Sequence, residues 1–165
     1  MPEPADQPAK HGRSLVGFYI ALGVVAVLVG LGAWLWTPLK ISYCERRVLD
    51  SSLFPGQRSE SGERLARTWP AAAPAVERLL RSDSHSRKAM LNGLVWAKAT
   101  WCLPLLAAEC QRQDGSSDCA MAIALSAQKI SGQDFGGKEN AELAVQNFLS
   151  WWEREGQAKY GGGGK

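Results

Sequence analysis

A long run without a charged side chain is the feature that most constrains this chain. No charged residue lies between Arg13 and Lys40, and residues 14–36 are strongly apolar. At about 1.5 Å of rise per residue, a helix over this segment is long enough to cross a hydrocarbon layer roughly 30 Å thick. The sequence therefore predicts a single transmembrane helix over residues 14–36.

The ends of this predicted helix carry residues typical of a membrane interface. Tyr19 lies near one end, Trp34 and Trp36 lie near the other, and Pro38 is expected to end the helix. The alternative is a cleaved secretory signal, which needs a shorter apolar core and a cleavage site of small residues. Because bulky side chains occupy positions 34–36, we expect an uncleaved anchor.

Small residues form a stripe along the predicted membrane helix. Their spacing of three, four and three places them on one helical face, where they would let a partner helix approach closely. Glycine and alanine are also common in lipid-facing helices, which is the alternative interpretation. The residues of this predicted helix-packing face are Gly23, Ala26, Gly30 and Ala33.

Four cysteines, all after the membrane helix, bear on the compartment. Their spacing fits no metal site and suits two disulfides in an oxidising environment. Cys110 and Cys119 flank a polar turn, so we expect them to pair, which leaves Cys44 with Cys102. The alternative is four reduced thiols inside the cell.

The orientation follows from the cysteines, because the positive charges on the two sides of the helix nearly balance. We expect a cell (inner) membrane protein with a cytoplasmic N-terminus and a periplasmic or other extracytoplasmic domain. The formal charge of +3 lies on the part after the helix, without a clustered basic stripe. Contact with the lipid bilayer is compatible with this charge, and nucleic acid is not an expected partner.

Composition divides the chain into five parts. Residues 1–13 are expected to be a disordered tail, 14–36 the membrane helix, 37–62 a juxtamembrane helix and a Ser, Gly and Pro loop, 63–160 an α-helical domain, and 161–165 a flexible Gly-rich tail. Apolar residues in the domain recur with helical spacing, so the predicted fold is all-α. The clearest stripe is Ala141, Ala144, Val145, Phe148, Leu149 and Trp152.

The middle of the domain contains an internal repeat. Each unit has a proline near the start of its first helix, an aspartate in its turn, and an Ala-rich second helix. Matches at a shift of thirty or thirty-one residues are Pro74 with Pro104, Asp83 with Asp114, Ala89 with Ala120, Met90 with Met121, and Leu94 with Leu125.

On these residues, together with Arg87 and residues 151–156, the domain resembles the HEAT/armadillo-like class of α-helical repeats. Asp118 stands where a second arginine would match Arg87. A third, partial unit, in which Ala144 and Leu149 match Ala89 and Leu94, lacks a clear first helix. The resemblance implies binding of other proteins, by a compact bundle or a short curved array.

The seven tryptophans fall into groups. Besides the two at the membrane interface, Trp69, Trp96 and Trp101 are expected to fill the core of the hairpins. Trp151 and Trp152 are adjacent, so both should not face inward on one α-helix. We expect one of them to lie on a partner surface.

No pattern of catalytic, metal or cofactor residues is present. The chain has no CxxC pair, no nucleotide-binding loop and only two histidines, His11 and His85. Residues 82–86 collect serine, aspartate and histidine, but residues this close in sequence are better explained as a polar turn. We therefore expect a protein that is not an enzyme and has no cofactor.

These patterns favour a membrane accessory or assembly subunit. Its expected partners are integral membrane subunits of a larger complex, bound through the membrane helix and the helical domain. The alternative is a membrane-anchored thiol-disulfide or chaperone-like factor that uses a labile Cys110 and Cys119 pair.

Overall fold

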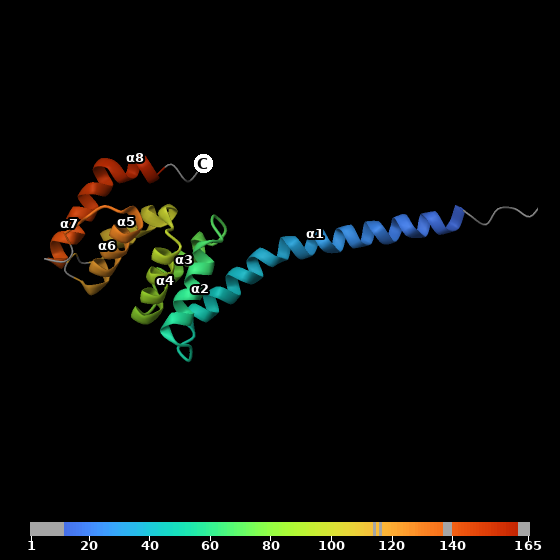
Figure 1. Ribbon diagram of the computed structural model, residues 1–165, viewed down its shortest axis with the longest axis horizontal. Helices are drawn as coiled ribbons and strands as arrows, with labels where there is room; N and C mark the ends of the chain where they lie inside the picture. Colours follow the sequence, from blue (N-terminus) through green and yellow to red (C-terminus); the bar gives the residue numbers. More distant parts are fainter. Residues whose placement is uncertain (1–11, 114, 116, 137–139, 162–165) are drawn as a thin grey trace, which may run out of the picture. The chain divides into compact units, whose positions relative to one another are not determined.

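The computed structural model describes residues 12–113, 115, 117–136 and 140–161, and these residues form no β-strand. The tails predicted over residues 1–11 and 162–165 lie outside the described residues. The all-α prediction is confirmed (Figure 1). The elements are α1 (Gly12–Leu49), α2 (Pro55–Ala66), α3 (Ala73–Leu80), α4 (Ser84–Trp96), the 3-10 helix η1 (Thr100–Cys102), α5 (Leu103–Arg112), α6 (Asp118–Ser131), α7 (Ala141–Trp151), the π-helix η2 (Trp152–Gly156) and α8 (Gln157–Tyr160).

Helix α1 is long and apolar enough to cross a membrane, by its length and composition. None of its most apolar stretch is buried against the rest of the chain. The chain divides into two compact units, residues 1–37 and residues 38–165, so the end of α1 belongs to the second unit.

The expectation that Pro38 ends this helix is wrong. Pro38 lies inside α1, which continues to Leu49. Proline removes one backbone donor from a helix, but the turns after it place Cys44 and Val48 in the core of the second unit, 3% and 0% exposed. Burial of these two side chains favours helical continuation past the proline.

The loop predicted in the second part of residues 37–62 is also wrong in part, because residues 55–62 are helical. Helix α2 begins at Pro55, in the first turn, where the missing N–H has no helical partner to lose. Its small and polar residues Arg58, Ser59, Ser61 and Gly62 are buried. These residues, whose composition is typical of a loop, thus form a packing face of a helix. The folded domain begins well before residue 63.

Helices α2 and α4 cross with their backbones in contact. A Cβ built on Gly93 would lie 2.4 Å from the carbonyl carbon of Gly62 and 2.5 Å from the amide nitrogen of Glu63. A Cβ on Gly62 would lie 3.2 Å from the carbonyl oxygen of Ala89. The crossing therefore requires glycine at position 93.

A buried arginine joins the end of α1 to this helix pair. Arg58 Nε donates to the carbonyl oxygen of Val48 at 2.7 Å, and its Nη2 donates to Ser86 Oγ at 2.8 Å. Ser86 Oγ in turn donates to Asp83 Oδ2 at 2.5 Å. The cation lies at the C-terminus of α1, where positive charge is favourable.

Later helices add to this pair in chain order. Helix α4 packs on α6 as well as on α2, and α6 packs on α5 and α7. Prolines 74 and 104 lie in the first turns of α3 and α5, and Asp83 is the N-cap of α4, as the repeat predicts. Asp114, the matching residue of the second unit, lies outside the described residues.

Three tryptophan predictions are wrong: that Trp69 is buried, that Trp96 is buried, and that one of Trp151 and Trp152 faces outward. Trp69 and Trp96 are 41% and 51% exposed, whereas Trp151 and Trp152 are both buried, at 7% and 6%. A π-helix begins at Trp152. Because a π-helix has more residues per turn than an α-helix, the directions of two adjacent side chains differ by a smaller angle. Gly156 makes room for both indoles, because a Cβ there would lie 2.6 Å from Trp152 Cε3 and 3.0 Å from Trp151 Cζ3.

Candidate partner-binding groove

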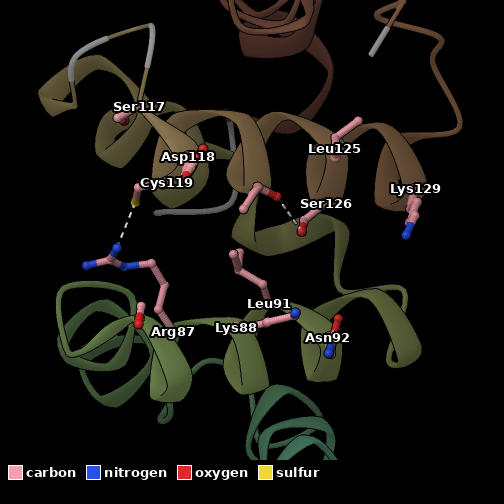
Figure 2. A pocket seen from close by; sticks show the side chains of 12 residues that line it. Arg87, Lys88, Leu91, Asn92, Ser117, Asp118, Cys119, Leu125, Ser126 and Lys129 are labelled. Carbon is pink, nitrogen blue, oxygen red and sulfur yellow. Dashed lines mark hydrogen bonds between the residues drawn. The ribbon is translucent and has the colours of Figure 1, made fainter. Parts of the chain in front are cut away.

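A groove of about 660 Å³ lies between α4 and α6 (Figure 2). On each helix the lining residues recur three or four positions apart, so each helix presents one face. The lining is Ser84, Arg87, Lys88, Leu91 and Asn92 from α4, and Ser117, Asp118, Cys119, Ala122, Leu125, Ser126 and Lys129 from α6 and its N-cap.

Apolar side chains line the middle of this groove and polar ones line its ends. Leu91 is buried, and Ala122 and Leu125 are half-buried. Figure 2 shows Arg87 reaching from α4 to Cys119 at one end, and Lys129 extending from α6 toward the α4 side at the other. The groove combines an apolar lining with cationic ends.

Arg87 is held in a fixed position by three hydrogen bonds. Its Nε donates to the carbonyl oxygen of Leu80 at 2.6 Å, its Nη2 to that of Ser82 at 2.8 Å, and its Nη1 to Cys119 Sγ at 3.0 Å. These acceptors are neutral groups. The guanidinium therefore keeps its net positive charge within the groove.

The cations of the groove differ from four exposed arginines in or directly after α2 and α3. Arg64, Arg67, Arg78 and Arg81 each form an ion pair with a glutamate. Within the described residues, no carboxylate pairs with any of the three groove cations, which are Arg87, Lys88 and Lys129. Asp118 is the single carboxylate among the lining residues, so they carry a formal excess of two positive charges.

The four cysteines all lie in the described part of the chain and are free thiols. The predicted Cys110–Cys119 and Cys44–Cys102 disulfides are not present. Cys110 Sγ instead contacts the carbonyl oxygen of Ala120 at 3.8 Å, and Cys119 Sγ accepts from Arg87. Cys44, Cys102 and Cys110 are buried, whereas Cys119 is half-buried in the groove.

Burial makes these thiols weakly acidic. Burial, together with a smaller effect of the nearby Cys119, raises the pKa of Cys110 to about 11. Burial also raises the pKa of Cys119, although the Arg87 guanidinium opposes this shift. Both groups are therefore protonated near neutral pH, which is unlike the thiolate of a redox-active cysteine.

The polar turn at residues 82–86 is a helix cap, as expected. Asp83 accepts hydrogen bonds from the backbone amides of His85 and Ser86, and the His85 side chain is exposed. Across the described residues, no three His, Cys, Asp or Glu side chains lie close enough to hold a metal ion. Among the sequence-predicted polar residues, Asp83 thus caps a helix, and the groove is lined by a different set of side chains.

Predicted residues of the membrane helix are described in part. Gly23, Ala26 and Gly30 are exposed, and a Cβ on either glycine would meet nothing within 4 Å. Tyr19 and Trp36 are also exposed. The side chains of Ala33 and Trp34 lie outside what the structure describes.

Sequence reasoning missed the groove, although a signal for it exists. Leu91 and Lys88 on α4, and Leu125 and Lys129 on α6, each place a leucine one turn from a lysine. That pattern is also typical of an ordinary solvated helix edge. Comparison with protein-family models, with curated proteins and with solved structures found no match.

Proposed function

We propose that this protein is a non-enzymatic, single-pass membrane accessory or assembly subunit of a larger complex. It lies in the cell (inner) membrane with its N-terminus in the cytoplasm, and its helical domain binds partners outside the cytoplasm. The observation that carries this proposal is the apolar helix α1, whose most apolar stretch is buried by none of the described residues. The same chain carries a separate helical unit with its own core.

The helix-packing face in α1 supports a role in assembly. Glycine at positions 23 and 30 leaves open space on one face of α1, and Ala26 lies between them on that face. Without side chains at these positions, the backbone of a second helix can approach closely. A membrane tether alone needs no such face.

Purification of the full-length protein in a mild detergent, followed by mass spectrometry, tests the proposal. We expect integral membrane proteins to co-purify in a fixed stoichiometry. The double variant Gly23→Ile/Gly30→Ile should lose them, because two β-branched side chains block the close approach. A wild-type protein that purifies alone as a monomer contradicts the proposal.

The chain offers a matched control for this variant. Gly17 and Gly32 lie on the other side of α1 at about 100° per residue, and a Cβ on either meets nothing within 4 Å. Gly17→Ile/Gly32→Ile adds the same side chains and should retain the partners. Equal loss in both double variants would indicate a general defect in membrane insertion.

The alternative, a thiol-disulfide factor, is disfavoured by the raised pKa values of Cys110 and Cys119.

The proposed orientation is tested separately. A membrane-impermeant maleimide added to intact spheroplasts should label the variant Lys159→Cys, whose new thiol is exposed and outside the groove. Labelling only after lysis would place the domain in the cytoplasm.

A further inference from the structure

The α4/α6 groove has the features of a docking surface for a charged partner. Its middle is lined by Leu91, Ala122 and Leu125, and its cations have no carboxylate partner among the described residues. An apolar lining favours burial of aliphatic side chains. Unpaired cations at its rim favour carboxylates over other flanking groups.

The length of the groove indicates the size of its occupant. The lining extends along α6 from Asp118 to Lys129. At about 1.5 Å per residue this is roughly 16 Å, which equals about three turns of a docked helix. A helix seated there would place residues i, i+3 or i+4, and i+7 along the groove.

We propose that the α4/α6 groove binds an amphipathic helix of a partner protein, with an aliphatic ridge that enters the groove and aspartate or glutamate residues beside the ridge. The ridge contacts Leu91, Ala122 and Leu125, and the acidic side chains pair with Lys88 and Lys129. This inference rests on the proposed function and specifies the chemistry of the partner.

A protein helix accounts for the lining better than anionic lipid headgroups do. Headgroups would pair with exposed Lys88 and Lys129 but would leave the half-buried Ala122 and Leu125 without an apolar contact. A single helix with an acidic flank satisfies both kinds of group. The two sources of negative charge are distinguished by experiment.

The test uses the full-length protein in nanodiscs of zwitterionic lipid and two synthetic helical peptides of about 14 residues. Both peptides carry leucine at i, i+3, i+7 and i+10. One has glutamates beside the leucines and the other has lysines. Fluorescence anisotropy measures binding, and the rate of maleimide labelling at Cys119 reports occupancy of the groove, because the other three thiols are buried.

We expect the acidic peptide to bind and to slow labelling of Cys119, and the basic peptide to do neither. Lys88→Glu/Lys129→Glu should weaken binding of the acidic peptide at least about tenfold, because two attractive charges become repulsive. The control Lys98→Glu/Lys159→Glu reverses two exposed lysines outside the groove and should leave affinity unchanged. Equal binding of the two peptides, or equal affinity in both variants, overturns the proposal.

A second variant separates groove occupancy from charge. Ala122→Phe fills the apolar lining without changing any charge, and should abolish protection of Cys119 while circular dichroism confirms an intact helical fold. Unchanged peptide affinity in this variant overturns the proposal. Replacement of the zwitterionic lipid by anionic lipid should not slow labelling in the absence of peptide, and slowing would assign the lysines to headgroups.

The two proposals fail in different ways. If membrane proteins co-purify with the wild type but the acidic peptide does not bind, the groove proposal is wrong and the subunit proposal stands. If the peptide binds and protects Cys119 but the wild type purifies alone, the subunit proposal is wrong.

Discussion

Helix α4 has two contrasting sides. Toward α2, the backbones touch at Gly62 and Gly93, and the buried polar groups are joined in the Arg58, Ser86 and Asp83 network. Toward α6, the two helices are in contact but leave a groove of about 660 Å³ between them, and its cations have no carboxylate partner among the described residues. The comparison indicates that one side fixes α4 in place, whereas the other side is available for binding.

The largest expected effect is at the glycine crossing. Gly93→Ala would place a methyl group 2.4 Å from backbone atoms that cannot rotate away, so α2 and α4 must separate. We expect a loss of about 3 kcal/mol in the free energy of unfolding, measured by urea denaturation in detergent. Gly56→Ala, also in this helix pair, meets nothing within 4 Å and should gain about 0.5 kcal/mol. Similar behaviour of the two variants would contradict the close crossing.

The next largest loss of stability is expected when the buried Arg58 is replaced. Arg58→Met keeps much of the side-chain volume but leaves the Val48 carbonyl and Ser86 without their donor. We expect a loss of about 2 kcal/mol. Ser86→Ala made alone and together with Arg58→Met completes a double-mutant cycle, and the two losses should not add. Strict additivity would show that the bond at 2.8 Å contributes nothing.

Removal of the α4 cap should have a smaller, pH-dependent effect. Hydrogen bonds from the Ser86 hydroxyl and amide, followed by that from the His85 amide, hold the pKa of Asp83 below its usual value. A lowered folded-state pKa gives stability that is present above the unfolded pKa of about 3.9 and is lost as pH falls through the folded pKa. Asp83→Ala should therefore cost about 1 kcal/mol at neutral pH, and its difference from the wild type should shrink below about pH 4.

Thermal unfolding at several pH values measures this difference. Asp118→Ala, in the first turn of α6, removes a carboxylate that accepts no hydrogen bond from the described residues, and should cost less than about 0.5 kcal/mol. A cost at Asp83 that stays constant down to pH 2 would show that the carboxylate charge has no part in the cap.

The smallest effect on stability is expected in the groove. Lys88→Glu/Lys129→Glu changes exposed side chains outside the ion pairs of the described residues. The free energy of unfolding should stay within about 0.5 kcal/mol of the wild type, although the affinity for an acidic helix falls. A loss of more than about 1 kcal/mol in the free energy of unfolding would indicate that these two side chains contribute to the stability of the fold.

Sequence patterns predicted the elements whose apolar residues repeat. The uncharged segment over residues 14–36 identified the apolar helix, and four residues of the predicted stripe, Ala144, Val145, Phe148 and Trp152, are buried, as their spacing indicates. Helix α2 was missed because its packing face is made of Ser59, Ser61 and Gly62 and not of large apolar side chains. Such a face is recognisable only when its partner, Gly93, is known.

Other errors arose where local rules assume one helix type or one partner. The geometry of an α-helix predicts that Trp151 and Trp152 do not both face inward, but the chain changes to a π-helix at Trp152. Cys110 and Cys119 were paired because they flank a turn, whereas Cys119 contacts Arg87 on a different helix. The groove depends on such long-range contacts, which spacing along the chain does not specify.

The order in which the helices pack has a consequence for biosynthesis. Helix α4 packs on α2, α6 packs on α4 and α5, and α7 packs on α5 and α6, so each helix finds a surface supplied by a segment that precedes it. Contacts between segments close together in the chain form faster than contacts between distant segments. Because each of these helices packs on helices close to it in the chain, the domain should fold rapidly once it has crossed the membrane in the proposed orientation.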